Sequence, residues 1–138
     1  MMICRGWFRC SVSALAAAAL GAQQPSYPPG VTAEVHAAIQ SGLKWLSKNQ
    51  AKDGSWRNSG GYGSYPAAMT GLAGMAFIAS GSTPTRGRYW REVRQSASFL
   101  LKHSNPENGV ISVPEEEGRS MYGHGFATLY LASVYGME

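Results

Sequence analysis

Residues 42–56 read GLKWLSKNQAKDGSW, and this stretch provides the pattern around which the rest of the chain can be organised. Its landmarks are two tryptophans, a glutamine and an Asp-Gly pair, namely Trp45, Gln50, Asp53, Gly54 and Trp56. A helix whose apolar face closes with Trp45 is predicted to end near Gln50. The Asp-Gly pair then indicates a turn, because glycine tolerates positive φ and aspartate bonds its own backbone. Trp56 follows at once, where an indole ring can cover the helix end.

The composition of the whole chain bounds its class. It has 138 residues, which suffices for one domain. Its hydrophobic content is 44% and its charged content only 14%, a balance typical of packed globular chains and not of disordered ones. The formal net charge is +4, and Arg5 and Arg9 at the start of the chain supply two of the positive charges. Because the remainder of the chain is then only slightly basic, its charge gives little support to a nucleic-acid partner.

Residues 1–22 are predicted to be a cleavable secretory signal peptide. Two arginines give a positive start, and the apolar run SVSALAAAALGA follows at 11–22. This run is shorter than the roughly 20 residues that a membrane helix needs. The alternative is an uncleaved amphipathic N-terminus. Export to the periplasm or the cell exterior is expected, and the two cysteines of the chain, Cys4 and Cys10, would leave with the peptide.

After a Pro-rich linker at 23–30, hydrophobic periodicity predicts four helices. The first and third, at 32–50 and 89–103, are amphipathic, and Thr32 is the expected N-cap of the first. The second, from 65 or 66 to 80, and the fourth, from 121 or 122 to the end, are almost wholly apolar and should be buried on most sides. The apolar faces expected on the amphipathic pair consist of Val31, Val35, Ala38, Ile39, Leu43, Leu46, Trp90, Val93, Ala97, Leu100 and Leu101.

The two halves of the chain align with a period of about 54 residues. The order of amphipathic helix, glycine-containing turn and buried helix occurs at 31–84 and again at 85–138, and such a repeat is a strong indicator of fold. The turn of the second copy has lost the glutamine and the tryptophan. Aligned pairs include Ile39 with Val93, Leu43 with Ala97, Leu46 with Leu100, Gly71 with Gly125 and Leu72 with Phe126.

The pattern of 42–56 resembles the QW repeat of the squalene cyclase and protein prenyltransferase superfamily, and the resemblance extends over residues 32–136. It implies an all-α fold, a partial α/α toroid with amphipathic helices in an outer ring and apolar helices in an inner one. The five landmark residues would be structural parts of the motif. Such toroids usually close with five or more hairpins. The two hairpins here are therefore expected to begin a longer toroid or to come from a truncated frame, and self-association of a short module is the alternative.

Ligand-facing candidates lie at the start of the apolar helices, at Tyr65, Tyr122 and His124. In a toroid these helix ends open on the central cavity, and free N–H groups there favour an anion such as a diphosphate. His124 could act as a general base, an anion contact or a metal ligand. A capped, hydrogen-bonded histidine at a helix start is the plainer interpretation.

The motifs of the family's enzymes are missing from this stretch. Asp53 is the only aspartate, whereas cyclases that protonate an alkene need Asp-x-Asp-Asp and ionising synthases need paired aspartates. The Asp, Cys and His zinc set of prenyltransferases is absent, and His36, His103 and His124 lack ligand spacing. The acidic run Glu115 to Glu117 lies in a predicted loop and is expected to be solvated. No catalytic residue, metal or cofactor is assigned.

These observations favour an exported binding or scaffold module of α/α-toroid type. The alternative is the N-terminal part of an isoprenoid-converting enzyme, similar to terpene or squalene cyclases, whose catalytic acids lie in further repeats. A third alternative is a toroid of the thioester-containing, complement-like kind, but the Gly-Cys-Gly-Glu-Gln motif is missing. The expected partner is an apolar or isoprenoid ligand, or another protein. A nucleic-acid partner and a transmembrane span in the mature chain are not expected.

Overall fold

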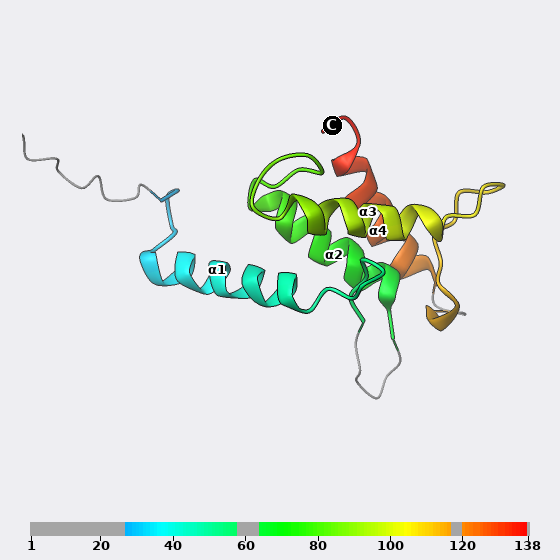
Figure 1. The fold of residues 1–138 in the computed structure, drawn as a ribbon, viewed down its shortest axis with the longest axis horizontal. Coiled ribbons are helices and arrows are strands. Elements are labelled where there is room, and N and C mark those ends of the chain that lie inside the picture. Colours follow the sequence, from blue (N-terminus) through cyan, green and yellow to red (C-terminus); the bar gives the residue numbers. More distant parts are fainter. Residues whose placement is uncertain (1–26, 58–63, 117–119, 138) are drawn as a thin grey trace, which may run out of the picture.

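The computed structural model describes residues 27–57, 64–116 and 120–137, and within these ranges the protein is all-α (Figure 1). Four α-helices and one short 3-10 helix follow each other: α1 (Ala33–Lys48), α2 (Pro66–Ala79), α3 (Trp90–Lys102), η1 (Pro114–Glu116) and α4 (Ser120–Val134). The described ranges hold no strand, only an isolated antiparallel bridge between Ser104 and Ile111. The predicted signal peptide at 1–22 lies outside them.

The predicted four helices are confirmed, and their ends differ by one or two residues except at the end of the fourth, which stops four residues before the end of the chain. The N-cap of α1 is Thr32, as predicted, because its Oγ1 accepts the N–H of Val35 at 3.3 Å. This helix ends at Lys48 and not at residue 50, because Asn49 has φ of −104° and ψ of 10° and has left the helical conformation. The second and third helices are each one residue shorter at both ends than the longest prediction, and α4 begins one residue earlier than predicted and ends at Val134.

The centre of the fold is the parallel pair of α2 and α4 (Figure 1). Glycines on α2 bring the two helices together in register, Gly71 against Phe126 and Gly74 against Tyr130. A Cβ added at Gly71 would lie 2.8 Å from the backbone carbonyl carbon of Phe126, which is too close for any side chain. The small residues that weaken α2 as an isolated helix are therefore those that permit its main contact. None of the helices in the described ranges is both long enough and apolar enough to cross a bilayer.

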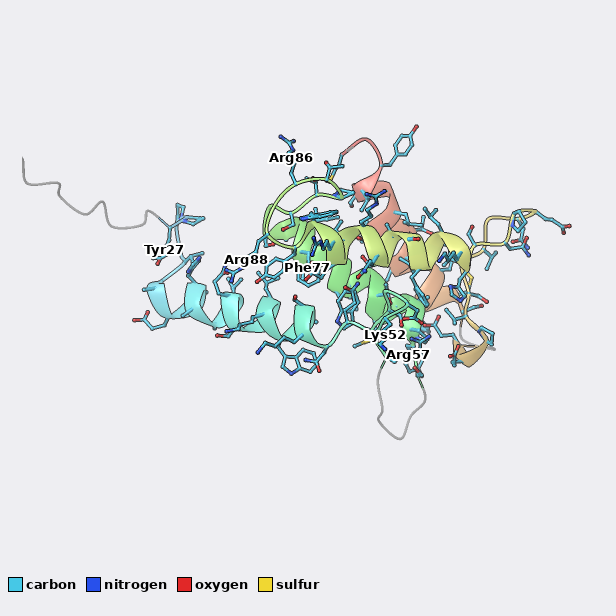
Figure 2. All side chains as sticks on the ribbon, in the orientation of Figure 1. Tyr27, Lys52, Arg57, Phe77, Arg86 and Arg88 are labelled. Atoms are coloured by element: carbon cyan, nitrogen blue, oxygen red, sulfur yellow. The ribbon has the colours of Figure 1, made fainter. Side chains whose placement is uncertain are left out.

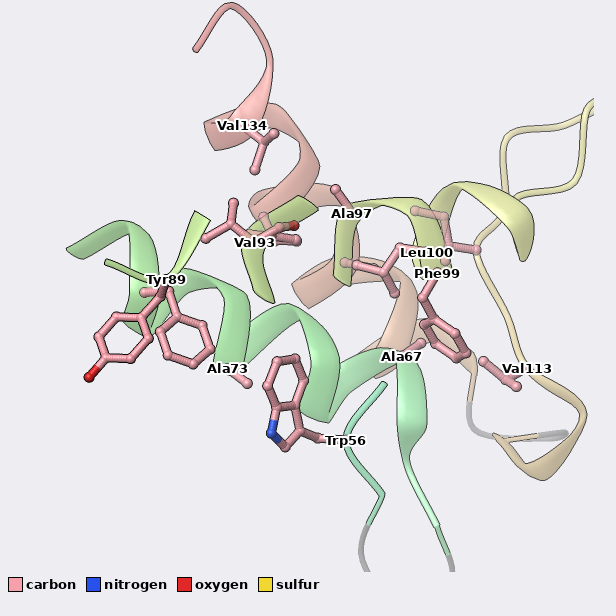
Figure 3. Close-up of a cluster of buried hydrophobic side chains, with 14 of the residues drawn as sticks. Trp56, Ala67, Ala73, Tyr89, Val93, Ala97, Phe99, Leu100, Val113 and Val134 are labelled. Atoms are coloured by element: carbon pink, nitrogen blue, oxygen red, sulfur yellow. The ribbon is translucent and has the colours of Figure 1, made fainter. Parts of the chain in front are cut away.

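The third helix packs over this pair and completes the core. The buried hydroxyl of Tyr130 donates to the carbonyl of Val93 at 2.8 Å and lies 2.7 Å from Ser96 Oγ. Burial raises the pKa of Tyr130 to about 12, which keeps its hydroxyl protonated as a donor. On α3 the prediction of a buried Leu101 is wrong, because Phe99 turns inward instead. Figure 3 shows much of this core, which includes Trp56, Ala67, Ala73, Tyr89, Val93, Ala97, Phe99, Leu100, Val113 and Val134.

The first helix joins the core through its C-terminal half. Leu43 is its one buried residue, whereas Val35 and Ile39 are 44% and 48% exposed and Trp45 is 61% exposed. The prediction that these side chains close a buried apolar face is therefore wrong within this chain. The N-terminal half of α1 extends past the other helices (Figure 1), and Tyr27 beyond it lies far from Phe77 of the core in Figure 2.

Candidate functional site

The turn after α1 ties this helix to the start of α3. The side-chain amide of Gln50 donates to the carbonyl oxygens of Gly54 at 3.0 Å and of Glu92 at 3.1 Å. Ser47 Oγ also donates to the Glu92 carboxylate, at 2.5 Å. Gly54 has φ of +93°, and a Cβ there would collide with the carbonyl of Gln95 on α3. A glycine is therefore required both by the turn and by the approach of the next helix.

The indole of Trp56 covers the end of α1, as its position after the turn indicated. Its Nε1–H donates to the carbonyl of Leu46 at 2.9 Å, and the centroid of its ring lies 5.8 Å from the centroid of the Phe77 ring. Its backbone N–H donates to Thr70 Oγ1 at 3.1 Å, which joins the turn to α2. The other tryptophan, Trp45, stays outside this arrangement on the solvent side of α1. Trp56 thus connects two helices through one side chain and one peptide group.

Asp53 holds the turn in shape. Its Oδ1 accepts from the N–H of Ser55 at 3.1 Å and from its hydroxyl at 2.7 Å, and its Oδ2 lies 2.8 Å from Arg57 Nη1. Partial burial pushes the pKa of Asp53 upward, but the Ser55 bonds and the Arg57 charge outweigh it and hold that pKa below its usual value. Arg57 lies at the turn in Figure 2. The only aspartate of the chain therefore has a structural role here.

A buried carboxylate stands at the start of α2. Sequence analysis expected Glu116 to be solvated, and this is wrong: η1 folds it against α2, where it is only 2% exposed. Its Oε1 accepts the N–H groups of Ala67 at 2.7 Å and Ala68 at 3.3 Å. Its Oε2 has no hydrogen-bond partner and lies against the Cα side of Gly123 on α4, where a Cβ would collide with it.

Two opposing effects act on this carboxylate. Burial raises the pKa of Glu116, and the neighbouring charge of Glu115 raises it further, whereas the N–H bonds from Ala68 and Ala67 lower it. Burial prevails. A negative charge is nevertheless well placed at a helix N-terminus. The chain itself thus supplies an anion to the first turn of α2, at one of the two helix ends where the sequence indicated that a diphosphate would be favoured.

The three ligand-facing candidates do not gather at one place. His124 is half-buried, and its Nδ1 accepts the N–H of Ile111 at 3.2 Å, so this nitrogen must be unprotonated in the bond. Tyr122, two positions earlier, is 73% exposed and points to the other side of α4, since two helical positions differ by about 200°. Tyr65 is half-buried in front of α2 and has partners of its own. His124 and Tyr122 therefore cannot act on one ligand from the same side of α4.

Tyr122 instead belongs to an exposed apolar surface that sequence analysis did not single out. Four large apolar side chains of α2 and α4 are exposed, and we call them the inner apolar surface: Leu72, Tyr122, Phe126 and Leu129. The last three recur at helical spacing on α4, which is the signal that could have found them. Neither helix carries an acidic or basic residue, apart from His124.

Two open hollows flank the helix pair. The larger, of about 940 Å³, lies between α3 and α4 and is lined by Arg94, Ala97, Leu101, Leu131 and Val134 among others. The smaller, of about 600 Å³, lies between the end of α1 and α2, next to Trp45 and Met69. Across the residues that the structure describes, no group of three or more His, Cys, Asp or Glu side chains is placed to hold a metal ion.

Comparison with known proteins identified no relative of this chain. No protein-family model matches the chain, and no match was found among curated proteins or among solved structures.

Proposed function

We propose that this chain is an exported binding module, built of two α/α-hairpin repeats of the squalene cyclase and prenyltransferase type. Its inner helices, α2 and α4, would take up an apolar ligand of isoprenoid chemistry. The toroid-like arrangement is supported by the parallel contact of these two apolar helices and by the bonds of Gln50 and Trp56. Export is supported by the charged start and apolar run within residues 1–22.

The observation that carries the ligand proposal is the inner apolar surface. Leu72, Tyr122, Phe126 and Leu129 are all exposed on helices that carry no acidic residue and no basic residue except His124, and exposed apolar patches mark interaction sites. Covering one such half-exposed side chain is worth about 1 kcal/mol, and four together about 4 kcal/mol. A gain of about 4 kcal/mol corresponds to a Kd of about 1 mM, and the cost of association weakens binding further, so the predicted Kd is about 1 mM or above.

Calorimetric titration with farnesol tests the proposal. Leu129→Asp places a charge in the centre of the inner apolar surface and should weaken binding at least about tenfold, since a ligand would have to cover an unpaired carboxylate. Ser41→Asp is the matched control, because Ser41 is an exposed residue of α1 remote from this surface, and it should bind as the unaltered chain does. An absence of farnesol binding, or equal binding by both variants, would refute the proposal.

Farnesyl diphosphate distinguishes the apolar part of the ligand from an anion. The first N–H groups of α2 are already bonded to Glu116, so the diphosphate should add little affinity at that helix end. Glu116→Gln removes the negative charge while it keeps an oxygen acceptor. If the diphosphate binds far more tightly than farnesol in the unaltered chain, the apolar ligand class is wrong.

A further inference from the structure

We propose that copies of this chain associate head to tail, with the α1–α2 end of one copy docked on the α3–α4 end of the next. The head face is defined by Val35, Ile39, Met69 and Leu72, and the tail face by Ala97, Leu101, Met121, Gly125 and Leu131. The inference rests on the two-repeat arrangement proposed above, but it does not depend on ligand binding.

The chain contains the proposed contact once, between its own two halves. The start of α3 docks on the C-terminal half of α1 and on α2. Tyr89 is buried just before α3, and the centroid of its ring lies 4.8 Å from the centroid of the Phe77 ring. Val93, one turn later, is fully buried. Glu92 receives the hydrogen bonds of Ser47 and Gln50. This is how the second helical hairpin is held on the first.

The equivalent seat in the second half is open. The 54-residue alignment places Leu101 on Ser47, Ala97 on Leu43 and Leu131 on Phe77. All three line the hollow of about 940 Å³ between α3 and α4. Leu101 is 60% exposed there, although its counterpart Ser47 bonds the incoming helix. The hollow therefore corresponds to the site at which α3 packs in the first half, and no segment of the described part of the chain fills it.

The matching face is exposed at the other end of the molecule. The same alignment places Val35 on Tyr89 and Ile39 on Val93, the two residues with which α3 docks. Both lie exposed on the N-terminal half of α1, which extends past the other helices (Figure 1). A second copy of α1 can therefore present to the open seat the apolar pair that corresponds to the one already used within the chain.

The inner helices repeat this complementarity. Gly71 receives the backbone of α4 at Phe126, whereas its aligned partner Gly125 has nothing within 4 Å of an added Cβ. Leu72, which aligns with Phe126, is exposed on α2. Stacking of a second copy would bring its Leu72 to Gly125 as Phe126 comes to Gly71.

Charge also favours this occupant. The open seat is lined by Arg94 and Lys102 without an acidic residue, and the first turn of α1 carries the exposed Glu34. A contact of this kind joins unlike faces, so each added copy leaves one head and one tail free. Growth continues until a ring closes or a filament forms.

Sedimentation velocity on the 138-residue chain tests the proposal with two single-face variants. Ile39→Asp blocks the head and Leu101→Asp blocks the tail, and each should weaken self-association at least about a hundredfold, because a carboxylate must then be buried where an apolar side chain packs. An equimolar mixture should form dimers and nothing larger, since only the intact tail of one variant and the intact head of the other remain. Ser41→Asp, on the other side of α1, should associate as the unaltered chain does.

The outcomes separate the inference from its competitors. All variants keep residues 1–26, so association through that segment would survive both substitutions and would overturn the proposal. A chain that stays monomeric at about 100 µM, or a mixture without dimers, would overturn it as well. Farnesol binding by monomeric Ile39→Asp shows whether the ligand proposal stands separately.

A third variant avoids any doubt about folding. Gly125→Ala adds a methyl group in open space on the helix, so the fold itself should not suffer. In the docked state this methyl would meet a neighbouring backbone, as it would at Gly71, and association should weaken at least about tenfold. Unchanged association of a well-folded Gly125→Ala chain would contradict the proposed interface.

Discussion

The same substitution at two aligned glycines should change stability in opposite directions. Gly71 of α2 and Gly125 of α4 are 54 residues apart and occupy the same place in the alignment of the two halves. Replacing a helix-interior glycine by alanine contributes about 1 kcal/mol through a smaller loss of backbone entropy. Both sites have that gain available, so their difference reports what surrounds the added methyl group.

The structure gives the magnitude at each site. At Gly125 an added Cβ has nothing within 4 Å, so the whole gain of about 1 kcal/mol should appear. At Gly71 it would lie 2.8 Å from the carbonyl carbon and oxygen of Phe126 and 3.1 Å from the nitrogen of Ala127. These are backbone atoms, so α2 and α4 must separate, at a cost of about 2–3 kcal/mol. The net loss at Gly71 should be about 1–2 kcal/mol.

Urea unfolding followed by circular dichroism at 222 nm measures both changes. For a chain of this size the midpoint of thermal unfolding should rise by about 3–6 °C in Gly125→Ala and fall by about 3–12 °C in Gly71→Ala. Gly42→Ala is the control, because this α1 glycine also has open space around an added Cβ. If Gly71→Ala were as stable as the unaltered chain, the close parallel contact of α2 and α4 would be refuted.

Three further substitutions test single contacts by urea unfolding. Trp56→Phe keeps a ring in the core but leaves an α1 carbonyl without its indole donor, which should cost about 1–2 kcal/mol. Tyr130→Phe should cost about the same, and the loss should be less than additive with Ser96→Ala, because the two hydroxyls share one hydrogen bond. Glu116→Gln should alter the pH dependence. Since burial raises the folded-state pKa of Glu116 above its unfolded value, this group favours folding most at acid pH, and its contribution is lost as pH rises through the folded pKa. The stability of Glu116→Gln relative to the unaltered chain should therefore increase across that acid range and level off above it.

Each of these has a contradicting result. An unchanged urea midpoint in Trp56→Phe would mean that the indole bond to α1 contributes nothing. Strict additivity of the Tyr130 and Ser96 losses would separate two groups that the structure joins. If the advantage of Glu116→Gln instead fell as pH rose, the two helix N–H bonds would outweigh burial, and the folded carboxylate would have a lowered pKa.

Local patterns in the sequence were sufficient for the helices. Four periodic segments, the Thr32 cap and the turn at Gly54 depend on neighbours within a few residues, and the structure contains all of them. The repeat, the toroid and the signal peptide go beyond the four helices and stay predictions. Their support is the alignment of the two halves and the composition of residues 1–22.

What the sequence could not give depends on the tertiary neighbourhood. Periodicity shows that α1 has an apolar face, but it does not show whether anything covers that face, and Val35 and Ile39 turned out exposed. Glu116 looks like part of a solvated acidic run until η1 brings it to the first N–H groups of α2, a contact that spans 49 residues. The separation of Tyr122 from His124, by contrast, could have been read from helical spacing alone.

The bond from Gln50 to the start of α3 has a consequence for mutational tolerance. Its acceptor at position 92 is a main-chain carbonyl, which every amino acid possesses. A change of side chain at that position would remove the Ser47 contact but would leave the glutamine link in place. The junction between the two hairpins thus depends on one particular amide on one side and on any helical backbone on the other. Variation at the beginning of α3 can therefore accumulate without separating α3 from the turn after α1, whereas replacement of Gln50 releases both of its acceptors at once.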